Sequence, residues 1–316
     1  MPSLRELLRH QDMNNIQEIE LSVVIAMFNE EENVGPLLLE LSRALDTLDS
    51  KAEIIVIDDA SADSTRAKLI DLCPTEPRLR VIGLKRNEGQ TSAIRTGIQQ
   101  AQGRIIITLD GDGQNPPDQM VKLLDEMKRS EADLVVGWRK KREDRFFAKR
   151  LPSLLANAII RIVTGTPVHD TGCTLKAIKS SLAQKLPLPS GMHRFIPALS
   201  RNLFLAKVVE VEVDHRPRLR GRSKYGWSRL FPVIRDVAMV GRLSFPGNVI
   251  TRLTEILVTF SVCRFLLMLD PWLSVVVGIL MSVTMDVICL RRLKQQKQSA
   301  IDFDSATRPV ERADRP

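Results

Sequence analysis

An apolar run that ends in two carboxylates constrains the fold of this chain more than any other feature. Residues 105–109 are rich in β-branched side chains, and Asp110, Gly111, Asp112, Gly113 and Gln114 follow them. A β-branched run that stops at polar residues is typical of a buried parallel strand, and open α/β sheets bind ligands beyond the carboxyl ends of such strands. We therefore expect the two acids to lie where the sheet binds its ligands.

The spacing of these polar residues suits a hard divalent cation. In an extended segment Asp110 and Asp112 would point the same way, and Gln114 would add a neutral oxygen on that face. Oxygen ligands on one side and open positions on the other suit Mg²⁺ or Mn²⁺ that also carries waters and substrate phosphates. The same residue types form ordinary turns, so a plain strand-to-helix turn stays open as an alternative.

Two further apolar runs, residues 21–28 and 53–57, also end at polar side chains. The polar residues that follow them are Asn29, Glu30, Asp58 and Asp59. Acids in the first turn of a helix interact favourably with its dipole, so helix capping is favoured over a ligand contact for Glu30. Of the two aspartates one can be structural, and the other can then accept hydrogen bonds from a nucleobase or ribose.

A third strand, predicted at residues 79–84, leads into a basic and glycine-containing loop. Arg86, Gly89 and Gln90 lie in this loop, which opens a helix that runs to Ala101. Free amides at a helix N-terminus and nearby cations together favour an anion site. The loop is neither a P-loop nor a complete dinucleotide fingerprint, and a solvated charge cluster is the alternative. The alternation of strands with helices predicts a doubly wound α/β sheet.

The second half of the chain carries two basic segments. After a strand at 132–137, residues 138–150 mix cations with aromatic side chains, which suits either a solvated linker or a loop that rests on an anionic membrane. After an edge strand at 208–213, residues 215–226 place cations around two glycines, as expected of a lid over phosphates. His193 and Arg194 open a further helix and could reach a substrate, whereas His169 and Asp170 face opposite ways and favour a structural role.

The charge of the chain indicates its class of partner. The net charge is +8 and the pI is about 9.5, which favours an anionic partner. Aromatic residues make up only 4% and include a single tyrosine, so stacking platforms for single-stranded nucleic acid are scarce. We therefore expect phosphorylated ligands or lipid head groups and no nucleic acid.

The C-terminal region is predicted to contact a membrane. Residues 227–248 have the spacing of an interfacial amphipathic helix, and residues 249–291 contain two apolar stretches joined by Asp270-Pro271. A transmembrane hairpin followed by basic residues would leave both ends in the cytoplasm. A hairpin that does not fully cross, or a self-associating pair, stays open because Arg264 and Asp286 interrupt the stretches. We expect residues 1–20 to form a polar leader, 21–226 the catalytic domain, and 292–316 a disordered cytoplasmic tail.

Taken in their joint order, these motifs resemble a known enzyme family. The segments that carry the resemblance are Val23-Val24-Ile25 before Asn29-Glu30, Asp58-Asp59-Ala60-Ser61, Arg86-Asn87-Glu88-Gly89 with Ala93 and Gly97, Asp110-Gly111-Asp112-Gly113-Gln114, and residues 218–224. They resemble family 2 glycosyltransferases, and within them the polyprenyl-phosphate branch that includes dolichol-phosphate mannose synthase. The resemblance implies a Rossmann-like GT-A fold with a mostly parallel sheet.

The same resemblance implies roles for individual residues. It implies a UDP- or GDP-linked sugar donor, with Asp59 on the base and Asp110, Asp112 and Gln114 around Mg²⁺ or Mn²⁺ on the diphosphate. Further donor contacts would come from Asn29, Glu30, Asp58, Arg86, Gly89 and Gln90. The acceptor phosphate would meet Arg139, Lys149 and Ser153, and Arg218 and Lys224 would act in catalysis by closing over the diphosphate.

The expected activity is inverting transfer of a hexosyl or glycuronosyl group to a polyprenyl phosphate, whether undecaprenyl, dodecaprenyl or dolichyl. It would take place at the cytoplasmic face of the inner membrane and serve envelope glycan or lipopolysaccharide modification. Two alternatives stay open. A glycosyltransferase with a saccharide or glycolipid hydroxyl acceptor would need a general base beside the acceptor. A silent membrane scaffold would bind nucleotide without metal-dependent turnover.

Overall fold

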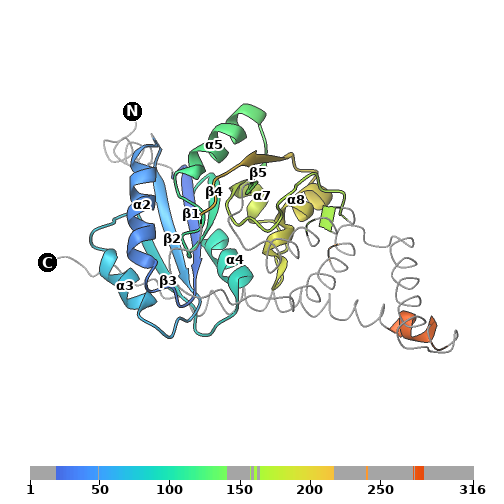
Figure 1. Ribbon diagram of the computed structural model, residues 1–316, viewed down its shortest axis with the longest axis horizontal. Helices are drawn as coiled ribbons and strands as arrows, with labels where there is room; N and C mark the ends of the chain where they lie inside the picture. Colours follow the sequence, from blue (N-terminus) through green and yellow to red (C-terminus); the bar gives the residue numbers. More distant parts are fainter. Residues whose placement is uncertain are drawn as a thin grey trace, which may run out of the picture.

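The structure is a computed structural model that describes residues 19–48, 50–140, 157, 160–161, 164–216, 240, 273 and 275–280 (Figure 1). Strands and helices alternate through the first half of this part of the chain, as the sequence predicts. The strands are β1 (Leu21–Met27), β2 (Ala52–Asp58), β3 (Leu79–Gly83), β4 (Ile105–Asp110), β5 (Leu134–Trp138), β6 (Lys176–Lys179) and β7 (Val208–Glu212). The helices are α2 (Val34–Asp46), α3 (Thr65–Leu72), α4 (Gln90–Gln100), α5 (Gln119–Ser130), α7 (Ser180–Ala183), the 3₁₀ helix η2 (Met192–Phe195) and α8 (Ile196–Phe204).

Within the described residues, the strands form one seven-stranded sheet in the order β3-β2-β1-β4-β6-β5-β7. Strand β6 runs antiparallel to both β4 and β5, and the other neighbouring pairs are parallel. The direction in which successive strands are added reverses between β1 and β4, which is a topological switch point of the kind at which α/β sheets bind ligands. The predicted doubly wound and mostly parallel sheet is therefore confirmed.

Both faces of the sheet are buried, which explains why its strands read as continuous apolar runs. Alternate residues of β1 contribute to opposite layers: Val24 packs with Ile94 of α4, and Ile25 packs with Leu41 of α2. The first layer also takes up α7, α8 and η2, and the second takes up α3 and α5. Central parallel strands covered by helices on both sides need apolar side chains at every position.

Gly97 allows α4 to lie directly on β1. A Cβ atom at this position would overlap the Val24 side chain, whereas a Cβ at Gly35, on the exposed side of α2, meets nothing within 4 Å. We predict that Gly97→Ala lowers the free energy of unfolding by about 1–3 kcal/mol, because overpacking outweighs the better helix propensity of alanine. Denaturant unfolding beside the matched Gly35→Ala variant measures this. Equal stability of the two variants would contradict the close packing of α4 on β1.

The parallel strands bring several polar residues to one edge of the sheet. Asp58 is paired with Met27 and Asp110 with Ala26, so these two acids flank the end of β1. Strand β5 ends at the same edge because β4 and β5 are both antiparallel to β6. The first residue of β6, Lys176, therefore also lies at this edge.

The predicted membrane segments fall almost entirely outside the described residues. Only Val240 is described within 227–248, and only 273 and 275–280 within the predicted hairpin at 249–291. In the described ranges, no helix has both the length and the apolar character that a membrane crossing requires. The hairpin, the interfacial helix and the C-terminal tail stay predictions.

Candidate functional site

The two carboxylates lie at the end of β4 and in the turn that follows it. The expectation of an extended segment is wrong, because β4 ends at Asp110 and the chain turns at Gly111 and Asp112. Gly111 is required here, since a Cβ atom would lie 2.7 Å from the Met27 Cγ atom at the end of β1. The turn still keeps the donors together: Asp112 Oδ1 accepts the Gln114 backbone N–H at 3.1 Å, and the negative charge of Asp112 acts on Asp110.

Asp110 is held in a partly buried and electrostatically costly position. Burial raises the pKa of its carboxyl group to about 6, and the nearby Asp112 charge acts in the same direction. Gln90 Nε2 donates a hydrogen bond to Asp110 Oδ1 at 2.7 Å. The positive charges of Arg139 and Lys176 oppose the rise in the pKa.

This donor set fits a hard divalent cation. A desolvated carboxylate beside a second one gains most when a cation is bound, and oxygen donors are the ligands that Mg²⁺ and Mn²⁺ prefer. Among the residues that the structure describes, no group of three or more histidine, cysteine or acidic side chains is placed to enclose a metal. The prediction that Asp110, Asp112 and Gln114 hold such a cation, with positions left for substrate oxygens and water, stays a prediction.

Asp59 fastens the loop before α4 to the end of β2. Its two carboxylate oxygens accept the backbone N–H groups of Glu88 at 2.7 Å and Gly89 at 2.9 Å. Burial raises the pKa of Asp59, and these two hydrogen bonds offset part of the rise. Asp58 is also buried and accepts the Ser61 N–H through Oδ1, but its Oδ2 has no hydrogen-bond partner in the described part of the chain. Asp59 is therefore the more structural of the pair, and its contact with a base stays a prediction.

Asn29 and Glu30 join the loops that follow β1 and β2. The Asn29 side-chain oxygen accepts the Ala62 N–H at 2.8 Å, and the Asn29 N–H donates to Ser61 Oγ at 2.9 Å. Glu30 accepts a hydrogen bond from the side chain of Asn33, the residue that precedes α2. The helix-capping role favoured for Glu30 is not seen, because α2 begins at Val34, its first turn holds no acid and Asn33 makes no side-chain capping hydrogen bond.

The first turn of α4 connects the acidic turn to η2. Next to Gln90, which holds Asp110, the Thr91 hydroxyl lies 2.7 Å from His193 Nδ1 and accepts the Gly191 N–H at 3.0 Å. His193 is therefore part of the same neighbourhood. Arg86, from the same loop as Gly89, is 84% exposed and contacts Glu88 at 3.4 Å, as expected of a cation that faces incoming solutes.

At the end of β5, Arg139 is fixed in a buried ion pair. Its Nε and one terminal nitrogen donate to the two oxygens of Asp170 at 2.7 and 3.0 Å. Burial disfavours the charge of Arg139, but Asp170 more than offsets this and raises the arginine pKa. Lys176 is also buried, and burial lowers its pKa to about 8. Asp110, Arg139, Asp170 and Lys176 thus form one charged cluster at the edge of the sheet.

The basic loop after β7 begins on the acidic turn. Arg216 donates from Nε to the Gly113 carbonyl and from a terminal nitrogen to Glu40, each at 2.6 Å, and its backbone N–H donates to the Gln114 carbonyl. The residues that follow, with Arg218 and Lys224, lie outside the described residues, as do Lys149 and Ser153. Their predicted roles stay predictions.

Sequence reasoning did not include Asp170, Lys176 or Arg216 in the site. Asp170 was assigned a structural role beside His169, and its actual partner is 31 residues away along the chain. No sequence pattern indicates that Lys176 belongs to the site, because only the antiparallel placement of β6 brings it to this edge. The cations around Arg216 did indicate phosphate binding, but not the contact with the acidic turn.

Comparisons with known proteins agree with this geometry. Residues 22–186 match the sequence model of the family described as Glycosyl transferase family 2. Over 227 residues the chain is 42% identical to the dodecaprenyl-phosphate galacturonate synthase of Rhizobium johnstonii, covering 71% of this chain and 67% of that protein. Over 264 residues it is 33% identical to the undecaprenyl-phosphate 4-deoxy-4-formamido-L-arabinose transferase of Aeromonas hydrophila, covering 81% and 79%.

Solved structures show the same architecture. Glucosyl-3-phosphoglycerate synthase from Mycobacterium tuberculosis, crystallised with Mn²⁺, UDP and glucosyl-3-phosphoglycerate, aligns with a TM-score of 0.54. The alignment covers 73% of this chain and 82% of that one at 21% sequence identity, which supports the α/β GT-A-like fold alone. Together with the family match over most of the described sheet, these findings show that the chain belongs to glycosyl transferase family 2.

Proposed function

We propose that this protein transfers a sugar from a nucleotide-sugar donor to a polyprenyl phosphate, with inversion at the anomeric carbon. The observation that carries the proposal is the pairing, at one edge of the sheet, of the Asp110–Asp112 acidic turn with the buried cation Arg139. Asp110 and Asp112 suit the metal-bound diphosphate of the donor, and Arg139 suits a second anion, the acceptor phosphate. The names of the two relatives, a dodecaprenyl-phosphate and an undecaprenyl-phosphate glycosyltransferase, support the acceptor class.

The donor is proposed to lie along the edge from β2 to β4. The loops after β1 and β2 would hold the nucleoside, and the polar start of α4 with Gln90 would lie beside the diphosphate. A divalent cation held by Asp110, Asp112 and Gln114 would neutralise negative charge on the diphosphate. The Mn²⁺ and UDP in the mycobacterial synthase support a metal and a nucleotide in this fold.

The acceptor is proposed to approach from the β5 side of the acidic turn. A lipid phosphate is already anionic, so its oxygen can attack the anomeric carbon without a strong general base. The task of the protein is then to align the two substrates and stabilise the leaving diphosphate. Arg139 would orient the acceptor phosphate, and Arg218 and Lys224, in the loop that starts at Arg216, would close over the diphosphate.

A polyprenyl acceptor requires a membrane surface beside the catalytic domain. We propose that residues 227–291 supply this contact and that the catalytic domain faces the cytoplasm at the inner membrane. The product would be a polyprenyl-phosphate sugar for envelope glycan or lipopolysaccharide modification. The sugar itself stays open, since one relative is named for galacturonate and the other for a formamido-arabinose.

The proposal is tested with the full chain, polyprenyl phosphate in detergent, Mn²⁺ or Mg²⁺, and a panel of radiolabelled UDP- and GDP-sugars. We expect label from one donor to enter the organic extract, to disappear with EDTA and to return with added metal. Transfer to a saccharide or glycolipid hydroxyl instead would contradict the proposed acceptor. Nucleotide binding without transfer from any donor would favour a silent scaffold.

A further inference from the structure

The side chain of Glu210, on the edge strand β7, is largely covered by the loop that precedes β6. Strand β7 pairs in parallel with β5, with Glu210 opposite Val136, and Figure 1 shows the two strands side by side. The Glu210 side chain is only 9% exposed despite its place on an edge strand. A carboxylate is rarely buried to this degree unless its oxygens are paired, so its partners indicate what it holds.

The partners of Glu210 are two consecutive backbone amides and one ring nitrogen. Oε1 accepts the N–H of His169 and the N–H of Asp170, both at 2.9 Å. Oε2 lies 2.8 Å from His169 Nδ1. One side chain thus fixes the backbone at Asp170, and Asp170 is the residue that binds the Arg139 guanidinium through both of its oxygens.

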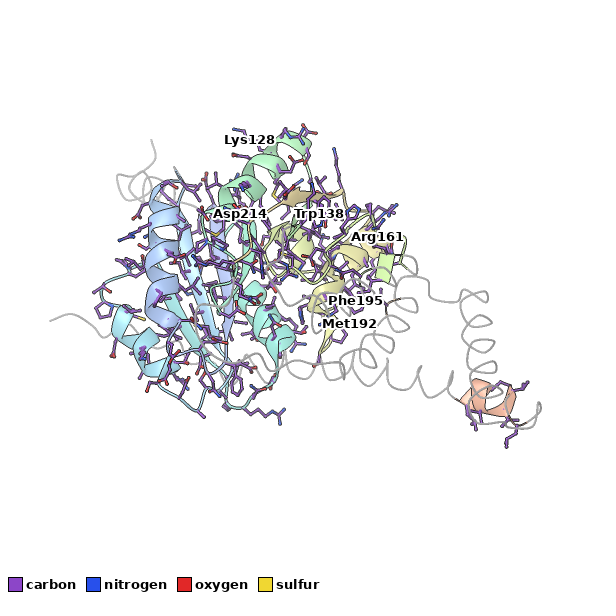
Figure 2. The ribbon with its side chains drawn as sticks, in the orientation of Figure 1. Lys128, Trp138, Arg161, Met192, Phe195 and Asp214 are labelled. Atoms are coloured by element: carbon purple, nitrogen blue, oxygen red, sulfur yellow. The ribbon has the colours of Figure 1, made fainter. Side chains whose placement is uncertain are left out.

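A second contact holds the same loop from the β5 side. The ring of His169 stacks on Trp138, with 4.7 Å between the ring centroids and 19° between the planes. Lys140 Nζ lies 5.3 Å from the centre of the Trp138 ring. Figure 2 labels Trp138 at the end of β5, beside the edge strand. The loop at 169–170 is therefore held by side chains of both β5 and β7, and its Asp170 binds Arg139.

The geometry points to Glu210 as a positioning residue for the acceptor phosphate. Glu210 fixes Asp170, and Asp170 holds Arg139 through Nε and one terminal nitrogen, so that the plane of the guanidinium is fixed close enough to Asp110 for their charges to interact. This inference rests on the proposed function, in which Arg139 meets the acceptor. A bidentate pair defines the plane of a guanidinium as well as its position, and a fixed plane matters for binding a phosphate.

Without the contacts from Glu210, Asp170 and Arg139 would still attract each other, but their positions would no longer be fixed. Small displacements of a substrate-positioning group can cost about a hundredfold in rate. The donor side of the site would be unaffected, because its contacts come from β1, β2, β4 and α4. The inference therefore predicts a defect in acceptor use with normal nucleotide binding.

The test compares Glu210→Gln with a matched control on the same strand. Glu212 lies two residues further along β7, is 48% exposed and pairs only loosely with Lys140 at 3.3 Å. We expect Glu210→Gln to raise the KM for polyprenyl phosphate about tenfold to a hundredfold, with an unchanged Kd for the nucleotide. Glu212→Gln is expected to keep both constants of the wild type. Thermal unfolding of each variant shows whether the fold is retained.

An unchanged acceptor KM in Glu210→Gln, or an equal loss of donor and acceptor binding, would overturn the inference in favour of a purely structural role. If Glu210→Gln does not fold, the same measurements are made on Glu210→Asp, because this variant keeps the charge but draws the carboxylate back by one methylene group. A raised acceptor KM with normal nucleotide affinity in this variant supports the inference, and an unchanged acceptor KM overturns it.

Arg139→Lys separates failure of this inference from failure of the proposed function. If the wild type transfers sugar and Arg139→Lys raises the acceptor KM while Glu210→Gln does not, only the role of Glu210 is wrong. If the wild type transfers sugar and Arg139→Lys leaves the acceptor KM unchanged, the acceptor contact itself is wrong, and the inference falls with it.

Discussion

Asp112→Ala is expected to lower the rate of sugar transfer by about a hundredfold to a thousandfold and to leave the fold intact. Removing one well-placed electrostatic contact to developing charge typically has an effect of this size. Asp112 lies in the turn after β4, where its Oδ1 accepts the N–H of Gln114 in the same turn. Its loss removes a donor for the cation without opening a cavity in either hydrophobic layer.

Three measurements on this variant check the prediction: the transfer rate, the affinity for Mn²⁺ in the presence of nucleotide, and the free energy of unfolding. Asp71→Ala is the matched control, because Asp71 is an exposed carboxylate on α3. The control should behave as the wild type in all three. A wild-type rate for Asp112→Ala in metal-depleted buffer would show that the acidic turn does not act through a metal.

Asp110→Asn is expected to stop turnover and yet to stabilise the fold at neutral pH. The folded protein raises the pKa of Asp110 from an ordinary value of 3.8 to about 6, so the ionised form is disfavoured by folding. This difference corresponds to about 3 kcal/mol lost at pH 7. An asparagine carries no charge, and its oxygen can still accept the hydrogen bond from Gln90. The variant should therefore regain most of this free energy.

The size of this effect depends on pH. The unfavourable contribution of Asp110 is absent below about pH 4, where the group is protonated in both states, and it grows as the pH rises through about 6. Wild type and Asp110→Asn should therefore have similar free energies of unfolding near pH 4, with the variant more stable above about pH 7. Denaturant unfolding without metal at both pH values measures the difference. A variant that is less stable than the wild type at pH 7 would contradict the prediction.

The sheet and its acidic edge could be predicted because buried parallel strands have a recognisable apolar pattern in the sequence. The runs that became β1, β2 and β4 are apolar at nearly every position, and each is followed by acids or an asparagine. Carboxyl ends of parallel strands meet at one edge, so the pattern alone predicts acids at the ligand-binding edge, and the strand order then places Asp58 and Asp110 on either side of β1. The position of the edge strand β7 followed from its alternating pattern.

The finer arrangement of the site depends on contacts between residues far apart in the chain. Strand β6 has four residues and no strong pattern, and its antiparallel insertion between β4 and β5 places Lys176 near Asp110. The partner of Arg139 is likewise set by the loop before β6. The sequence indicates that one of Asp58 and Asp59 can be structural, and only the folded loop shows that backbone amides bind both oxygens of Asp59.

The most direct test of the central claim is the phosphorus content of the lipid product. Transfer of the sugar alone to a polyprenyl phosphate gives one phosphorus atom per lipid, in a phosphodiester, whereas transfer of a sugar phosphate would give a diphosphate with two. Mass spectrometry and ³¹P NMR of the purified lipid distinguish these products. We predict a single phosphodiester that depends on both Asp112 and a divalent metal. A diphosphate product, or label on a hydroxyl acceptor, would contradict the account.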